Sequence, residues 1–159
     1  MYILEMRDDL SMATEESKQS LKLYIVLSRA HKAITETTNQ FIQQQGVNPT
    51  EFGVLELLYH KGSQTLQQIG QKILLASGSI TYVVDKLENR GYLVRNACPN
   101  DRRVTYAEIT DAGKAFMEEV FPLHEARMHE LMGVLTPEEK ECAIELLKKL
   151  GLSIKDLSY

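Results

Sequence analysis

Two groups of residues in the middle of the chain have side chains suited to contacting a polyanion. The first is the run Asp101-Arg102-Arg103, which follows Pro99 and places two guanidinium groups beside a carboxylate. An arginine on a stiffened loop fits the negative potential of a DNA minor groove, and a nearby carboxylate can hold its guanidinium in one pose. The alternative is a solvated turn with a surface ion pair, which contributes about 0–1 kcal/mol. Spacing alone does not decide between the two.

The second group lies along a predicted helix and consists of Ser77, Ser79, Thr81, Tyr82 and Lys86. Small hydroxyl groups at a helix N-terminus can donate to phosphate oxygens, helped by the positive end of the helix dipole. Side chains near the start of a helix in the major groove also reach the edges of the bases. Serines at such a position are often simple helix caps instead. The surrounding elements must therefore decide whether this helix faces DNA.

Apolar periodicity and capping signals predict the elements that position these residues. Capping patterns mark the starts of later helices, such as Asn48-Pro49-Thr50-Glu51, Thr65-Leu66-Gln67-Gln68 and Thr136-Pro137-Glu138-Glu139. Pro122 should bend the fifth helix or open one of its backbone hydrogen bonds. The predicted helices cover about 17–45, 49–61, 65–75, 77–90, 111–132 and 137–151, with Gly151 ending the last one.

The period changes to that of strands at residues 92–95 and 104–109, which predicts a hairpin with Asp101, Arg102 and Arg103 near its tip. A helix, a short helix, an amphipathic helix and a basic-tipped hairpin follow each other in the order of a winged helix-turn-helix. We therefore predict one domain that is mainly α with a small β-wing. Residues 49–110 would form its DNA-binding part, and residues 17–45 and 111–151 its dimerisation helices.

Composition limits the alternatives. The chain has 159 residues and a net charge of −4, so it is not a polycation that coats nucleic acid by charge alone. Residues 21–110 nevertheless carry 10 basic and 7 acidic side chains, whereas both ends are acidic. The two cysteines, Cys98 and Cys142, make neither a disulfide framework nor a paired-cysteine zinc site, which fits a reducing cytoplasm. Signal-peptide and membrane-spanning patterns are not found.

Enzyme and metal chemistry find little support. The sequence contains no Gly-rich phosphate loop, no Gly-x-Ser-x-Gly elbow and no His-Glu-x-x-His motif, so we expect neither an enzyme nor a cofactor. Glu125 and His129 share one helix face, but two ligands do not make a metal site. A winged domain used only for protein contacts remains an alternative, although such a module does not need two arginines at the hairpin tip.

Three stretches together resemble the MarR family of bacterial transcription regulators. They are the run from Ser79 to Arg95, the wing Pro99-Asn100-Asp101-Arg102-Arg103, and the junction Ile109-Thr110-Asp111-Ala112-Gly113. The resemblance covers nearly the whole chain. It implies a homodimer with intertwined terminal helices that reads a pseudo-palindrome in double-stranded DNA, usually as a repressor released by a ligand or an oxidant. Residues 58–62 and 74–82 look closest to Gram-positive regulators of quinone and catechol resistance genes.

The resemblance also implies roles for single residues. Arg103 matches the arginine that enters the minor groove, Asp101 matches the acid that orients it, and Arg102 is an additional basic group. The residues that match recognition-helix positions, where the family varies its side chains to choose an operator, are Ser77, Ser79, Thr81, Tyr82 and Lys86. Tyr82 stands where arginine is frequent.

Two sensing modes remain open. Family members hold small aromatic or phenolic effectors between the first, second and fifth helices, which makes candidates of Tyr24, His31, Phe41, Tyr59 and Phe116. Each of these residues could equally belong to the hydrophobic core. Some relatives sense oxidants through a cysteine in the first helix, but this chain has none there. Cys98 in the wing is the alternative redox site, since nearby arginines would favour its thiolate.

Overall fold

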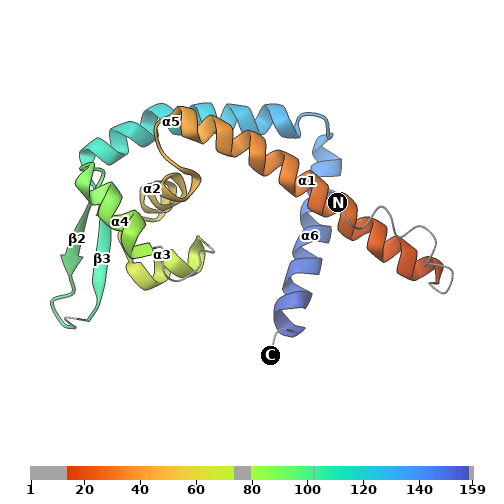
Figure 1. The fold of residues 1–159 in the computed structure, drawn as a ribbon, viewed down its shortest axis with the longest axis horizontal. Helices are drawn as coiled ribbons and strands as arrows, with labels where there is room; N and C mark the ends of the chain where they lie inside the picture. Colours follow the sequence, from red (N-terminus) through yellow and green to blue (C-terminus); the bar gives the residue numbers. More distant parts are fainter. Residues whose placement is uncertain (1–13, 74–79, 102, 158–159) are drawn as a thin grey trace. The chain divides into compact units, whose positions relative to one another are not determined.

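The computed structural model describes residues 14–73, 80–101 and 103–157, and the contacts divide the chain into residues 1–37 and residues 38–159, a boundary within the first helix. Figure 1 shows the elements along the chain. They are α1 (Glu15–Gln44), α2 (Pro49–Lys61), β1 (Gln64–Thr65), α3 (Leu66–Lys72), α4 (Ile80–Asn89), β2 (Leu93–Ala97), β3 (Thr105–Ile109), α5 (Asp111–Met132) and α6 (Pro137–Leu157). The predicted order of elements is confirmed.

The wing is a three-stranded antiparallel sheet with the order β1-β3-β2. In the hairpin, Leu93 lies opposite Ile109 and Ala97 lies opposite Thr105. The prediction of two strands was incomplete, because Gln64 of β1 also pairs with Ala107 of β3. A strand of two residues is too short to show an alternating pattern, so only its pairing partner reveals it.

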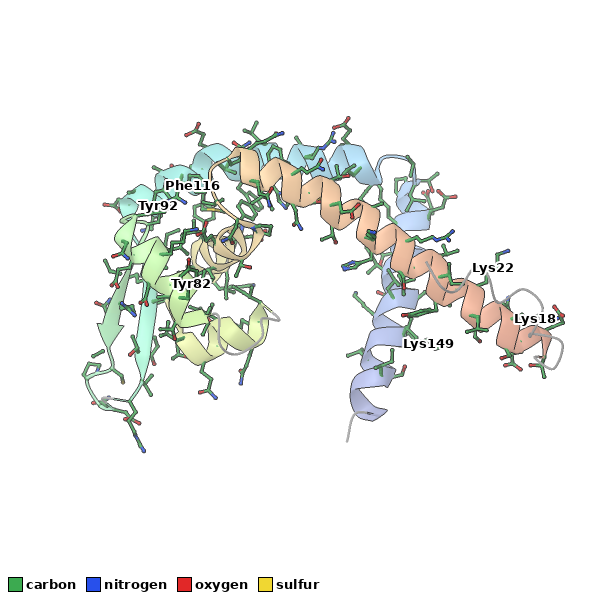
Figure 2. All side chains as sticks on the ribbon, viewed as in Figure 1. Lys18, Lys22, Tyr82, Tyr92, Phe116 and Lys149 are labelled. Carbon is green, nitrogen blue, oxygen red and sulfur yellow. The ribbon has the colours of Figure 1, made fainter. Side chains whose placement is uncertain are left out.

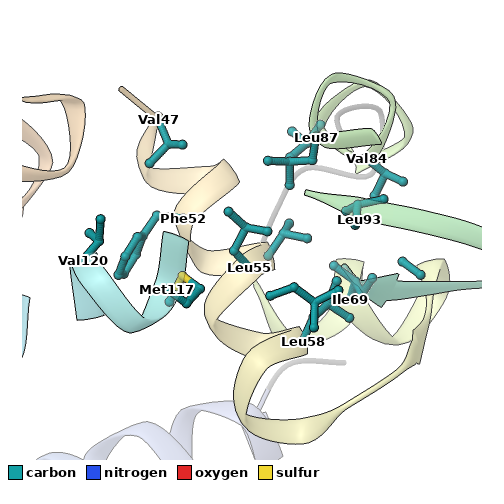
Figure 3. Close-up of a cluster of buried hydrophobic side chains, with 14 of the residues drawn as sticks. Val47, Phe52, Leu55, Leu58, Ile69, Val84, Leu87, Leu93, Met117 and Val120 are labelled. Carbon is teal, nitrogen blue, oxygen red and sulfur yellow. The ribbon is translucent and has the colours of Figure 1, made fainter. Parts of the chain in front are cut away.

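The hydrophobic core lies within the second unit, and its fully buried side chains come from the segment between Ile42 and Val120. Helix α4 contributes Val83, Val84 and Leu87, which confirms the apolar stripe predicted for it. Figure 3 shows Val84 and Leu87 near Leu55 of α2, together with Leu93 at the start of β2. The core therefore joins α4 and the wing to α2 and to the first half of α5.

The predicted capping boxes are present. In α2 the Glu51 N–H donates to Asn48 Oδ1 and the Asn48 N–H donates to Glu51 Oε2, both at 2.8 Å. Thr65 with Gln68 starts α3, and Thr136 with Glu139 starts α6, in the same reciprocal way. These bonds satisfy backbone donors that have no partner inside the helix.

Helix ends were predicted less well than helix starts. Gly151 does not end the last helix, because α6 continues through it to Leu157; an interior glycine costs only about 1 kcal/mol relative to alanine. The third helix ends at Lys72, short of the predicted end near Leu75, which lies outside the described residues. Helix α5 continues through Pro122, where the sequence predicted a bend or one open backbone hydrogen bond, and it ends at Met132. Among the described helices, none is long and apolar enough to cross a membrane.

The junction between the wing and α5 explains the Ile109–Gly113 motif. Thr110 donates its hydroxyl proton to the Gly91 carbonyl at 2.5 Å and accepts from the Gly113 N–H at 3.1 Å. Gly91 has φ of +75°, a conformation that side chains disfavour. A Cβ on Gly113 would stand 2.2 Å from the Tyr92 carbonyl oxygen, so only glycine fits there. The two glycines and the threonine lock the end of α4 to the start of α5.

Candidate DNA-binding surface

The face of α4 opposite the core carries Thr81 and Tyr82, two of the predicted recognition residues. Thr81 and Tyr82 are exposed, and the Tyr82 side chain retains 68% of its accessible surface. Figure 2 shows Tyr82 on α4, away from the stacked pair of Tyr92 and Phe116. Ser77 and Ser79, which were predicted to face DNA as well, lie outside the described residues. The described part of α4 thus presents a polar face that starts at Thr81.

The wing tip holds an exposed arginine in one pose. Arg103 donates from Nε to Asp101 Oδ1 at 3.1 Å and from Nη2 to Asp101 Oδ2 at 3.3 Å, and its side chain is 90% exposed. The Arg103 N–H also donates to Asp101 Oδ1. These hydrogen bonds lower the pKa of the Asp101 carboxyl below its ordinary value. The predicted pairing of the two residues is present, and Arg102 lies outside the described residues.

Lys86 is not a free cation. Its Nζ lies 2.6 Å from Oε1 of Glu51, whose side chain is only 1% exposed. Sequence reasoning assigned Glu51 to the capping box alone and did not find this contact. The available signal was the spacing of Lys86 and Arg90, which places two basic groups one helical turn apart on α4.

A second ion-pair cluster joins α4 to the wing. Arg95 of β2 lies 2.6 Å from Asp85 Oδ1 and 2.6 Å from Glu88 Oε2, both on α4. Its side-chain hydrogen bond lowers the pKa of Glu88, and a second bond from its backbone N–H adds to the effect. Arg95 therefore fixes the hairpin to the helix.

The five effector candidates fall into two sets. Tyr24 and His31 lie on the part of α1 within residues 1–37, where both are exposed. Phe41, Tyr59 and Phe116 are half-buried and pack against the hydrophobic core of the second unit. Phe41 stacks on His124 at 6.4 Å between ring centroids, and Phe116 stacks on Tyr92 at 5.1 Å. The second set therefore has a packing role whether or not it also meets an effector.

The cysteines lie apart in the chain, Cys98 half-buried just after β2 and Cys142 exposed on α6. The Cys98 N–H donates to the Val104 carbonyl at 2.9 Å and closes the hairpin. No group of three His, Cys, Asp or Glu side chains placed to hold a metal ion occurs within the described ranges. A redox role for Cys98 stays a prediction.

Comparison with known proteins now bears on this geometry. The MarR family profile matches residues 47–105, from the end of the α1–α2 turn to the start of β3. The HTH-type transcriptional regulator MhqR of Bacillus subtilis is 58% identical over 139 residues, covering 87% of this chain and 96% of that protein. The chain belongs to the MarR family. It is therefore a DNA-binding transcriptional regulator rather than an enzyme.

Solved MarR-type structures have the same fold. Sco3205 of Streptomyces coelicolor, a MarR family regulator crystallised with DNA, has a TM-score of 0.77 at 21% identity over 89% of this chain and 92% of its own. BpsR of Bordetella bronchiseptica, whose DNA binding is regulated by 6-hydroxynicotinic acid, has a TM-score of 0.70 at 25% identity over 82% and 98%. Family membership favours DNA binding over the alternative of a module for protein contacts alone.

Proposed function

We propose that this MarR-family protein is a homodimeric, cytoplasmic repressor that reads a pseudo-palindromic operator and leaves it when a small aromatic or phenolic effector binds. In each protomer α4 would enter the major groove and the wing the minor groove. The proposed DNA-facing residues are Ser77, Ser79, Thr81, Tyr82, Asp101, Arg102 and Arg103, while Lys86, on the same helix as Tyr82, is paired with Glu51. The observation that carries the proposal is the pair Asp101–Arg103 at the wing tip, on the same unit as the exposed face of α4.

The geometry of that pair suits a groove. A guanidinium held by a carboxylate keeps little rotational freedom, so less entropy is lost when it enters a confined space. Asp101 partly offsets the positive charge of Arg103. The guanidinium still faces solvent, since the Arg103 side chain is 90% exposed. Narrow A·T-rich minor grooves favour arginine through their negative potential. We therefore expect the operator to carry A·T-rich sequence where each wing lands.

Apolar surface on α6 supports the dimer. Its exposed large apolar residues are Ile144, Leu146, Leu147, Leu150, Leu152 and Ile154, and α6 contributes none of the described fully buried side chains. Exposed apolar residues of this density on one helix mark an interaction site. A two-fold partner would cover them and place the two recognition helices about 34–36 Å apart, one DNA turn.

The effector proposal rests on aromatic and polar side chains of the first, second and fifth helices and on a relative. BpsR is regulated by a hydroxylated aromatic acid, and this chain offers rings and polar groups at Tyr24, His31, Phe41, Tyr59 and Phe116. A ligand that prefers one spacing of the two α4 helices shifts the protein away from the DNA-bound state. A coupling of about 1–3 kcal/mol would weaken operator binding roughly 5- to 150-fold.

The test uses duplexes selected by the purified protein from a random-sequence pool. Arg103→Ala should weaken binding to the selected operator and lower the slope of log K against log salt by about one per wing. Lys114→Ala is the matched control, because Lys114 also pairs with an exposed aspartate, Asp111, but at the start of α5. If no sequence is enriched, the proposed function is wrong. If Arg103→Ala binds as wild type does at fixed salt, the wing has no part in it.

A further inference from the structure

We propose that Glu51 is a positioning residue for DNA recognition, which holds α4 through Lys86, and that Lys86 acts through this contact and not by touching DNA. The inference rests on the proposed function, in which α4 enters the major groove. It changes the role that the sequence predicted for Lys86 and adds Glu51, a buried residue of α2.

The structure places Glu51 at the meeting point of three segments. Its Oε2 accepts from the Asn48 N–H at 2.8 Å, its Oε1 lies 2.6 Å from Lys86 Nζ, and its Oε2 lies 3.7 Å from Arg90 Nη1. Arg90 also donates from Nη1 to the Gly46 carbonyl at 2.8 Å. The turn before α2, the first turn of α2 and the second half of α4 are therefore tied at one carboxylate.

Capping alone does not explain this carboxylate. A capping box needs one side-chain oxygen, and the box of α3 uses the neutral Gln68 in the same position. The box of α6 uses Glu139, which is exposed. Glu51 differs from both because it is buried and faces cations from another helix. Burying a charge is costly unless it is paired, so the pairing with α4 accounts for its presence.

The pairing also supplies what apolar packing cannot. Val83, Val84 and Leu87 bury one stripe of α4, and such contacts are non-directional, so they tolerate small rotations of the helix about its axis. An ion pair to a carboxylate that is itself fixed by a helix cap instead ties one point on α4 to one point on α2, here Lys86 Nζ to Glu51 Oε1 at 2.6 Å. Lys86 and Arg90 are one turn apart and meet it from two points along α4. The rotation that presents Thr81 and Tyr82 is thereby set.

The state of Lys86 agrees with this role. Hydrogen bonding to Glu51 raises the pKa of Lys86 above its ordinary value, which favours the charged ammonium. Its charge is matched by the buried carboxylate, whereas Arg103 at the wing tip is 90% exposed. Recognition geometry must be held to within about 0.5 Å by groups that are themselves fixed, and Glu51 is such a group.

The experiment compares Glu51→Gln, Lys86→Met and the double variant. Glutamine keeps the cap of α2 and removes the charge, and methionine keeps most of the lysine stem. Each is titrated with the selected operator and with a scrambled duplex over a range of salt. Positioning predicts that either single change weakens operator binding roughly 2- to 150-fold, that the double variant is no weaker than the worse single one, and that scrambled-duplex binding and the salt slope stay unchanged.

The sign of the Glu51→Gln effect is decisive. Removing a negative charge from a DNA-binding unit strengthens DNA binding if charge alone matters, so weaker operator binding points to position. Lys86→Arg, which keeps the ion pair, should restore most of the operator affinity. Two results would overturn the inference: additive losses in the double variant, or a Lys86→Met loss that is equal on both duplexes with a salt slope lower by about one per site.

The same measurements separate this inference from the proposed function. If wild type enriches no operator, the proposed function is wrong. If wild type binds its operator and Glu51→Gln binds equally well, only the inference is wrong. Thermal unfolding of each variant shows whether it is folded, and should Lys86→Met not fold, Glu51→Gln and Lys86→Arg still test the inference, because they leave no unpaired charge buried.

Discussion

The winged region and helix α6 use apolar residues in opposite ways. Between Ile42 and Val120 most large apolar side chains pack into one core, with Leu55, Ile69 and Leu87 fully buried. On α6 the residues of the same type stay exposed, Leu147 at 49% and Leu152 at 64%. The first region buries most of its apolar surface within the chain, whereas α6 leaves its large apolar side chains exposed.

This difference assigns DNA binding and dimerisation, in the proposed function, to different parts of the chain. A buried core lets each winged region hold α4 and the wing in place within one protomer. An uncovered helix gains free energy by burying its face against another chain, at roughly 25 cal/mol per Å² of apolar surface. Dimerisation through such helices would then set the distance between the two α4 helices without changing the fold of either DNA-binding part.

Charge placed on the apolar face of α6 should have the largest effect on assembly and on operator binding. Leu147→Glu with Leu150→Glu should yield a monomer, because carboxylates cannot be buried in an apolar interface without partners. Loss of bivalent binding should weaken operator affinity about 10²- to 10⁴-fold. Sedimentation velocity and an operator titration measure the two effects. Lys148→Glu puts the same charge on the polar side of α6, where Lys148 pairs with Glu145, and should leave the dimer intact.

A change in the winged core should act on stability instead of assembly. Leu55→Ala removes a side chain with no exposed surface and should lower the free energy of unfolding by about 2–5 kcal/mol. Val134→Ala, at a residue that is 86% exposed, should stay within about 0.5 kcal/mol of wild type. Denaturant unfolding followed by circular dichroism gives both values. Equal losses at the two sites would contradict the division between a buried core and an exposed surface.

Release from DNA shows which region receives the signal. The double variant Cys98→Ser, Cys142→Ser should still leave the operator when a catechol or hydroquinone is added under reducing conditions, with the roughly 5- to 150-fold loss expected of a bound ligand. An operator titration with and without the compound measures it. If wild type is released and the double variant stays bound, a thiol is the sensor, with Cys98 in the wing replacing the aromatic residues.

The smallest effect concerns the wing tip, where the pose depends on two neighbouring residues rather than on the core. Nuclear magnetic resonance titration should place the pKa of Asp101 below its ordinary value, and Arg103→Ala should return it toward that value. Because the folded pKa is lowered, the contribution of the pair is complete above the ordinary pKa. It is lost as the pH falls through the lowered pKa. An unshifted Asp101 would mean that the carboxylate does not hold the arginine in solution.

Patterns along the chain were sufficient to predict the features of this protein that depend on residues close together in sequence. Capping boxes, the apolar stripe of α4 and the Asp101–Arg103 pair each need only residues a few positions apart, and all of them are present. The family motif at 109–113 combines both kinds of contact, because the Gly113 N–H donates to Thr110 within one turn of α5, whereas the Thr110 hydroxyl bonds to Gly91 and Gly113 packs against Tyr92. The helical order and the winged architecture follow from these local signals.

Contacts between segments that are far apart in the sequence became visible only in the folded structure. Strand β1 exists because Gln64 meets Ala107, and Glu51 is more than a cap because α4 brings Lys86 against it. The end of α6 beyond Gly151 was missed because one glycine costs a helix too little to stop it. Pairing and burial depend on which surfaces meet after folding, and a pattern along the chain records only which residues are able to meet.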